Sequence, residues 1–246
     1  MESTTLWYEG PLAAFGVETT GADTEHDRIV CAALVVQHQP SSPPRVTRWL
    51  VSPGVEVPAA ATRAHGLTES HLQHFGRWPS PVMEEVGRAL SSHAAAGVPL
   101  VVMDAPFGLT LLDRELRRHR NSSLATYLGT GVLCVLDPRV LDGHLDPQRP
   151  GGSALADLCA AYEVVRQEGD DPHDTAARAL AALTVVRSIG RRHRDRIGAH
   201  RLAELHARQA VWHAAQARGP QAWFAKPGEA LPDPAWPLRP ELPHAA

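Results

Sequence analysis

An uninterrupted apolar run at residues 29–36 is the feature that most constrains how this chain can fold. The run has no polar alternation, which is typical of a β-strand buried on both faces. We predict three consecutive strands at residues 12–18, 28–37 and 45–51, with a Ser-Ser-Pro-Pro turn between the last two. A strand buried on both faces needs helices on each side of its sheet, so the sequence predicts an α/β fold.

Alternating helices and strands follow. Further strands are predicted at residues 98–103 and 132–136, and apolar residues at every fourth position predict a helix at residues 82–96, after a Pro-Ser-Pro break. Asp137 and Pro138 are typical of the N-cap and the first position of a short helix. The other helices are predicted at residues 58–64, 68–74, 105–119, 153–162 with Ser153 as N-cap, 173–192 and 199–218.

Three short motifs lie where this pattern places strand ends and a helix start. They are Gly16-Val17-Glu18-Thr19, the segment from Asp104 to Gly108, and the segment from His173 to Arg178. In order and spacing they resemble the motifs of the DEDDh 3′–5′ exonucleases, the DnaQ-like family of proofreading subunits. The resemblance covers about residues 7–196. It implies a ribonuclease-H-like fold with a central mixed five-stranded sheet flanked by helices.

The resemblance also implies a two-metal centre, in which four carboxylates hold two Mg²⁺ or Mn²⁺ ions. The family has Asp at the positions of Gly16, Gly108 and Arg178, so only the carboxylate of Glu18 is present. A unit-charge pair at about 4 Å is worth roughly 4 kcal/mol at an effective dielectric near 20. Two divalent ions beside Arg178 are therefore strongly disfavoured. We expect no metal cofactor and no working nuclease centre.

Glu18 and Arg178 are the central candidates in the altered site. If both project into one pocket, an ion pair is expected, because an unpaired buried charge costs several kcal/mol. Alternatively, the Arg178 guanidinium binds a phosphate or carboxylate in place of the metal. His173 matches the general base of the family. With Glu18 it is the candidate catalytic pair of a metal-free reaction, or else it is a retained loop residue or a donor to a bound anion.

The matched positions also predict a ligand pocket. Gly16 and Gly108 remove side-chain volume, so the pocket is expected to be enlarged. A single weak metal held by Glu18, Asp104 or Asp174 stays open, although Asp174 is expected to stabilise a helix N-terminus. The candidate ligand-binding residues are Thr19, Thr20, Phe107, Leu111 and Arg178.

Three functions follow from these alternatives. The leading one is a pseudo-exonuclease that acts as a binding or regulatory protein, with a nucleotide, a nucleic-acid 3′ end or a small anion as partner. The second is a repurposed, metal-independent enzyme acting on a small molecule in a partly apolar cleft lined by Phe15, Phe107 and Leu111. The third is a residual 3′–5′ exonuclease that uses one metal ion.

The composition limits which ligands and which cellular location are expected for the chain. A net charge of −3 gives no overall basic field for nucleic-acid binding. Arginine clusters at residues 114–120 and 191–196 are expected on solvated helix ends, with phosphate binding as the alternative.

Three widely spaced cysteines indicate buried reduced thiols. Without a membrane-spanning apolar run or a signal-peptide pattern, a cytoplasmic protein is expected. The Ala, Arg and Pro content suggests a GC-rich genome, such as that of an actinomycete.

Two regions are predicted along the chain. Residues 1–198 form the exonuclease-like domain, and residues 199–246 form a helix followed by a proline-rich tail. Proline excludes regular helix from the tail. We expect Trp223 and Trp236 to pack onto the domain, since indole rings favour burial. A partner-binding arm is the alternative.

Overall fold

The computed structural model describes residues 6–165, 171, 173–219 and 233–241. Its centre is a five-stranded sheet in the order β3-β2-β1-β4-β5. The β1–β2 and β2–β3 pairs are antiparallel, and the β1–β4 and β4–β5 pairs are parallel. The predicted mixed five-stranded α/β architecture is confirmed. The strands span Leu12–Thr19 (β1), Ile29–Gln37 (β2), Arg45–Leu50 (β3), Leu100–Val101 (β4) and Val135–Leu136 (β5).

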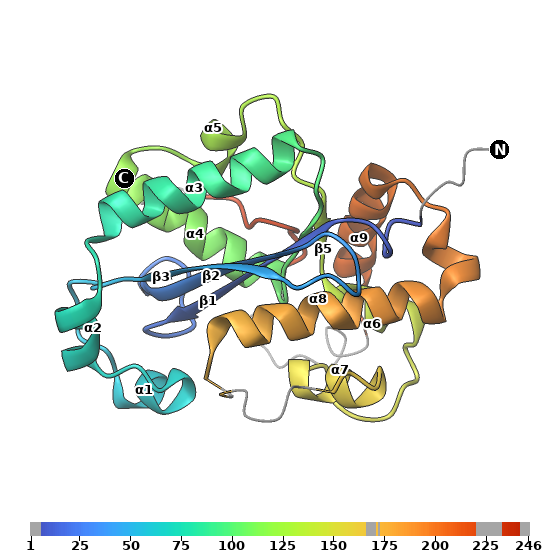
Figure 1. The fold of residues 1–246 in the computed structure, drawn as a ribbon, viewed down its shortest axis with the longest axis horizontal. Helices are drawn as coiled ribbons and strands as arrows, with labels where there is room; N and C mark the ends of the chain where they lie inside the picture. The colour runs from blue at the N-terminus through green and yellow to red at the C-terminus, as the bar shows by residue number, and fades with distance from the viewer. Residues whose placement is uncertain (1–5, 166–170, 172, 220–232, 242–246) are drawn as a thin grey trace.

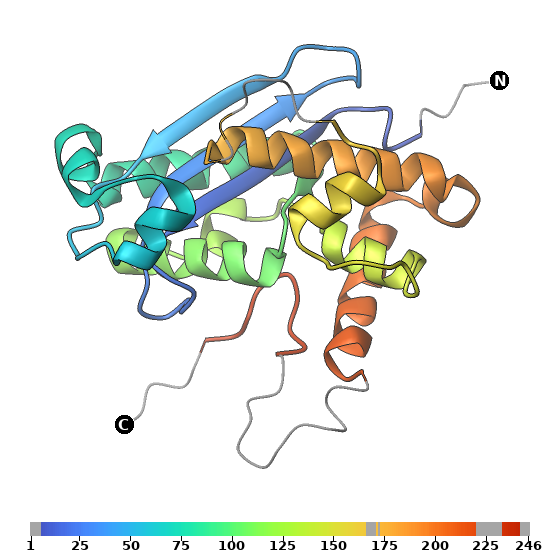
Figure 2. The same ribbon diagram turned by 90° about the horizontal axis from the view of Figure 1, so that it is seen from below.

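Helices cover both faces of the sheet. Figures 1 and 2 show α3, α4 and α5 on one face and the long α8 across the other, with α6 and α7 beside it. None of the described helices is long and apolar enough to span a membrane. The helices span Ala59–His65 (α1), Glu69–Phe75 (α2), Pro79–Ala95 (α3), Ala105–Arg120 (α4), Leu124–Leu128 (α5), Pro138–Leu145 (α6), Leu155–Ala161 (α7), Thr175–Arg192 (α8), Arg194–Gly198 (η1, π-helical) and Leu202–Ala217 (α9).

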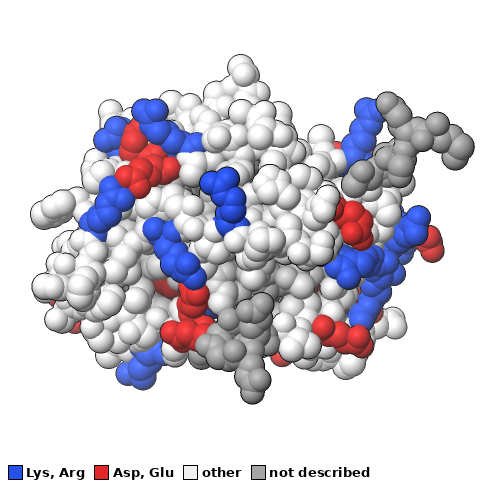
Figure 3. Space-filling model, in the orientation of Figure 1, with Lys and Arg blue, Asp and Glu red and all other residues white. Residues whose placement is uncertain are grey.

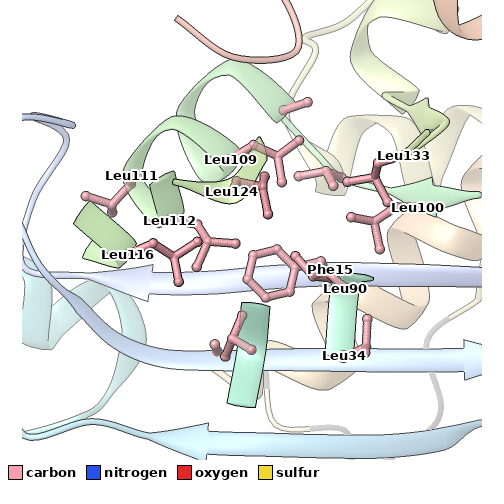
Figure 4. Close-up of a cluster of buried hydrophobic side chains, with 14 of the residues drawn as sticks. Phe15, Leu34, Leu90, Leu100, Leu109, Leu111, Leu112, Leu116, Leu124 and Leu133 are labelled. Carbon is pink, nitrogen blue, oxygen red and sulfur yellow. The ribbon is translucent and has the colours of Figure 1, made fainter. Parts of the chain in front are cut away.

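The apolar run in β2 is buried on both faces, as predicted. Ala32 and Leu34 belong to the hydrophobic core under α3 and α4, whereas Ala33 and Val35 belong to the core under α8. Figure 4 shows the first core, where Phe15 and Leu34 of the sheet lie among leucines of the covering helices. Successive residues of β2 therefore lie in the cores on opposite faces of the sheet, which explains why the run lacks polar alternation.

Some predicted helix limits are wrong. Helix α3 begins at Pro79 and not at residue 82, because proline fits the first turn, where backbone N–H groups have no intrahelical partner. The N-cap of α7 is Ala154 and not Ser153, and the Ala154 N–H donates to Asp157 at 3.1 Å. Helices α5 and η1 were not predicted. Strands β4 and β5 are two residues each, shorter than expected.

Asp137 joins the starts of two helices. As predicted, it is the N-cap of α6, where its Oδ1 accepts from the Arg139 N–H at 2.9 Å. Its Oδ2 accepts from the N–H of Ala105, the first residue of α4, also at 2.9 Å. The side chain is almost completely buried, and this burial raises the pKa of Asp137 to about 6. One carboxylate thus fixes both helices at the carboxyl ends of β4 and β5.

The segment at residues 233–241 packs on the domain near α4 and α9 (Figure 2). Trp236 is 8% exposed and its ring centre lies 4.9 Å from that of His206. The backbone of this segment is tied to α4, where the Arg239 N–H donates to Oγ1 of Thr110 at 2.9 Å. The predicted packing is thus seen for Trp236, and Trp223 lies outside the described residues.

Candidate functional site

Glu18 and Arg178 form an ion pair at the end of β1. The Arg178 Nη1 donates to Oε1 of Glu18 at 2.8 Å. Glu18 is 9% exposed in its side chain, whereas Arg178 is 43% exposed. Burial raises the pKa of Glu18 above its usual value, and the nearby Arg178 guanidinium opposes that rise. The ion pair expected from the sequence is present.

Removing Arg178 should destabilise the fold. In an Arg178→Ala variant, Glu18 would be left largely buried without its cation, and we expect the free energy of unfolding to fall by about 1–2 kcal/mol. A Glu18→Gln change in the same chain should restore most of the loss, because no buried charge remains. Chemical denaturation of the two variants and the natural protein measures both effects. If Arg178→Ala unfolds at the same denaturant concentration as the natural protein, the pair does not support the fold.

The two glycines beside this pair leave room for larger side chains. A Cβ built at Gly16 would lie 3.4 Å from the Thr175 carbonyl oxygen, with Ala179 Cβ at 3.5 Å. At Gly108 the nearest atom would be a methyl group of Val102, at 3.5 Å. These are ordinary or only slightly tight contacts. The space beside each glycine is therefore empty because glycine has no side chain, and the neighbouring atoms would not exclude a Cβ there.

The ion pair and both glycines line one pocket of about 490 Å³. It lies between the end of β1, the start of α4 and the first turns of α8. Its lining comprises residues 15–19, residues 102–104, Phe107, Gly108, Arg139, residues 153–155, Thr175, Arg178, Ala179 and Ala182.

A second ion pair lies in the same pocket. The Arg139 Nη1 donates to Oδ2 of Asp104 at 3.2 Å, and both side chains are about half exposed. Asp104 precedes α4 with a left-handed φ of 57°, a conformation that aspartate tolerates better than most residues. Sequence reasoning missed Arg139. Its position two residues after Asp137, at the carboxyl end of a parallel strand, was the signal that could have found it.

His173 lies outside this pocket. Its ring Nδ1 is 3.0 Å from the Ala64 carbonyl oxygen, and its Cγ would lie 3.4 Å from a Cβ built at Gly66. It lines a neighbouring cavity of about 560 Å³, together with His65 and Cys31. The next residue, Asp174, caps α8 by accepting from the Ala176 N–H at 3.0 Å, as expected. His173 thus does not line the pocket that contains Glu18, although Thr175 lines both cavities and the His173 ring is near enough to oppose the rise that burial causes in the pKa of Glu18.

The other candidates divide between the pocket and the core. Thr19, Phe107 and Arg178 line the pocket. Thr20 does not, because its hydroxyl donates to Oδ1 of Asp27 at 2.7 Å. Leu111 does not either, since it is fully buried among the leucines of the first core (Figure 4).

The carboxylates of the pocket are already paired with cations. Glu18 and Asp104 each accept from a guanidinium, and Asp174 accepts from Arg48 at 2.7 Å outside the pocket. In the part of the chain that the structure describes, no three His, Cys, Asp or Glu side chains gather as a metal-ligand group. This donor set does not fit a centre of two divalent ions.

The clustered arginines of α4 form ion pairs with carboxylates of the same chain. Arg114 is 7% exposed, and its Nε lies 2.9 Å from both carboxylate oxygens of Glu25. Arg117 donates to Asp113 at 2.8 Å. The expectation of a solvated face is therefore wrong for Arg114, because these guanidiniums fold back onto nearby carboxylates. On the face in Figure 3, Lys and Arg stand among Asp and Glu and form no continuous basic surface.

Comparison with known proteins gives one curated relative and a set of similar structures. No protein-family model matches the chain. A protein of Rhodobacter capsulatus named "DNA polymerase III subunit epsilon-like protein" is 34% identical over 199 residues, which cover 74% of this chain and 27% of the relative. The chain therefore spans about a quarter of that relative.

Exonuclease I proteins are among the solved structures that are similar to this chain. Exonuclease I of Methylocaldum szegediense has a TM-score of 0.60 and 18% identity, over 87% of this chain and 44% of that one. E. coli exonuclease I in complex with a dT13 oligonucleotide has a TM-score of 0.60 and 13% identity, over 76% and 42% of the two chains. The chain thus spans less than half of each of these structures.

Proposed function

Because the chain has the DnaQ-like 3′–5′ exonuclease fold, as its sequence motifs predicted, we propose that it is a pseudo-exonuclease. It acts as a binding or regulatory protein and does not cleave nucleic acid by a two-metal mechanism. The observation that carries this proposal is the Glu18–Arg178 ion pair, which occupies positions that the motif resemblance matches to metal-binding carboxylates of the family.

Electrostatics supports the proposal. The guanidinium of Arg178 lies within hydrogen-bond distance of Glu18, and a divalent ion at that carboxylate would face this fixed positive charge. At about 4 Å, the repulsion is roughly 8 kcal/mol for a doubly charged ion at an effective dielectric near 20. Asp104 offers no free replacement, because Arg139 neutralises it. We infer that the chain uses neither Mg²⁺ nor Mn²⁺ as a cofactor.

The same residues support binding of an anion. A guanidinium in the pocket attracts a phosphate or carboxylate, whereas a cluster of carboxylates would attract a cation. The structurally similar E. coli exonuclease I binds an oligonucleotide. By analogy, a nucleotide, a nucleic-acid 3′ end or a small anion is the partner proposed for this chain.

A nuclease assay tests the proposal. The purified chain and a Glu18→Ala variant are incubated with 3′-labelled single-stranded DNA and RNA in Mg²⁺ or Mn²⁺, with an active exonuclease I as positive control. We expect no label release by either form. If the natural chain releases label and Glu18→Ala does not, the pocket holds a metal and the proposal is wrong.

A metal-independent enzyme is the second candidate. Glu18 is buried at the pocket, and burial raises its pKa above the usual value, which is the direction that favours a role as general acid or base. The pocket volume lies within the range of small-molecule sites. His173 does not line the pocket, so in this structure the candidate depends on Glu18 and Arg178. Turnover of a bound small molecule, abolished by Glu18→Gln, would favour it.

A further inference from the structure

The two arginines of the pocket leave the same part of their guanidinium groups free. Arg178 contacts Glu18 through Nη1, and Arg139 contacts Asp104 through Nη1. Within the described part of the chain, neither Nε nor Nη2 of these arginines has a hydrogen-bond partner. Nε and Nη2 together form the side of the guanidinium that binds a carboxylate or phosphate with two parallel hydrogen bonds.

Other arginines of the chain use this side for their own carboxylates. Arg48 donates through Nε and Nη2 to Asp174, at 3.3 and 2.7 Å. Arg149 does so to Asp142, at 2.9 Å for both bonds, and Arg208 does so to Glu204, at 2.9 and 2.8 Å. In the pocket, by contrast, each carboxylate binds only Nη1 of its arginine, so Nε and Nη2 are available to another acceptor.

The charges and walls of the pocket define that acceptor. Its two ion pairs cancel, so a ligand is selected by directed hydrogen bonds and not by a net positive field. The remaining walls are mainly apolar, with Phe15, Phe107 and Leu155 among them. A volume of about 490 Å³ fits a small organic molecule.

We propose that this pocket binds a compact organic molecule with two anionic groups, one on the Nε and Nη2 side of Arg139 and one on that of Arg178. The anionic groups are phosphates or carboxylates, and the body between them packs against the apolar walls. The inference rests on the proposed function, since metal ions in the pocket would compete with Arg139 and Arg178 for the carboxylates of Asp104 and Glu18.

Calorimetry with chosen probes tests the inference. The probes are adenosine 3′,5′-bisphosphate, adenosine 5′-monophosphate, adenosine and citrate, titrated into the full chain at low salt. We expect a compound with two or more anionic groups to bind at least about tenfold more tightly than the monophosphate, since a charged hydrogen bond contributes about one to two decades of affinity. Adenosine should not bind. Comparing the bisphosphate with citrate distinguishes phosphate from carboxylate as the preferred group.

Lysine variants separate charge from geometry. Arg139→Lys and Arg178→Lys keep the positive charge and the contact with the carboxylate but lose the two-bond side, so each should weaken binding of the preferred probe about tenfold or more. Arg208→Lys is the control, because Arg208 is 49% exposed and already uses this side on Glu204. It should bind like the natural chain.

Three results would overturn the inference. These are no binding of either polyanion at millimolar concentration, equal binding of the monophosphate and the bisphosphate, or equal effects of Arg208→Lys and Arg139→Lys. None of them affects the pseudo-exonuclease proposal, which fails only if the natural chain cleaves nucleic acid with metal. The two ideas can therefore fail separately.

Discussion

Replacing Gly16, Gly108 and Arg178 together by aspartate should convert the chain into a metal-binding protein with 3′–5′ exonuclease activity. The change removes the cation beside Glu18 and adds three carboxylates to the pocket, where Cβ atoms at both glycines meet only ordinary or slightly tight contacts. We expect Mn²⁺ binding by calorimetry and cleavage of 3′-labelled DNA at least about 100-fold above the natural chain, since a metal ion supplies several kcal/mol to this reaction.

Two controls make that result specific. Adding Glu18→Ala to the triple variant should abolish both metal binding and cleavage, because it removes one of the four carboxylates. Restoring only Gly16→Asp and Gly108→Asp while keeping Arg178 should give little of either, since the guanidinium still opposes the ions. A triple variant that folds but binds no Mn²⁺ would show that the three positions are not the lost metal ligands.

Asp137→Ala should be the most destabilising change among the polar residues discussed above. It leaves the buried N–H group of Ala105 and the partly buried N–H group of Arg139 without their acceptor, and it removes the N-cap of α6. We expect the free energy of unfolding to fall by about 3–4 kcal/mol near pH 5, measured by urea denaturation. A loss below about 1 kcal/mol at that pH would mean that other groups or water satisfy these donors.

The pH dependence of this loss has a definite sign. The pKa of Asp137 is about 6 in the folded chain and near 3.8 when the carboxyl is exposed, so the folded state holds a proton that the unfolded state releases between these values. Its contribution to stability is complete below the unfolded pKa and is lost as the pH rises through about 6. Asp137→Ala should therefore cost roughly 1 kcal/mol less near pH 8 than near pH 5.

Asp174→Ala is the matched control for that pH series. Asp174 is also a helix N-cap, but its hydrogen bond from Arg48 lowers its pKa below the usual value. Its contribution is present above the unfolded pKa and is lost only in stronger acid. The cost of Asp174→Ala should therefore be equal near pH 5 and near pH 8.

Features set by local sequence could be predicted well. The apolar run of β2 indicated a doubly covered strand, and Asp137 with Pro138 marked the start of α6. The missed features depend on tertiary packing. Nothing near His173 in the sequence indicates that Ala64, more than 100 residues earlier, supplies its hydrogen-bond partner. Arg139 was likewise missed, because it meets Asp104 only after the parallel strands β4 and β5 align their carboxyl ends.

The contact between His173 and Ala64 affects the cleavage rate expected of the triple aspartate variant. If the three aspartates bind metal, the candidate general base is still held by the last turn of α1, through the Ala64 carbonyl oxygen. If catalysis needs His173 in the pocket, the observed rate is the intrinsic rate multiplied by the fraction of molecules in which that contact is broken. The cleavage rate of the triple variant would then measure a conformational equilibrium. Gly66, whose left-handed φ of 73° ends α1 beside the His173 ring, would be the position at which a substitution shifts that equilibrium.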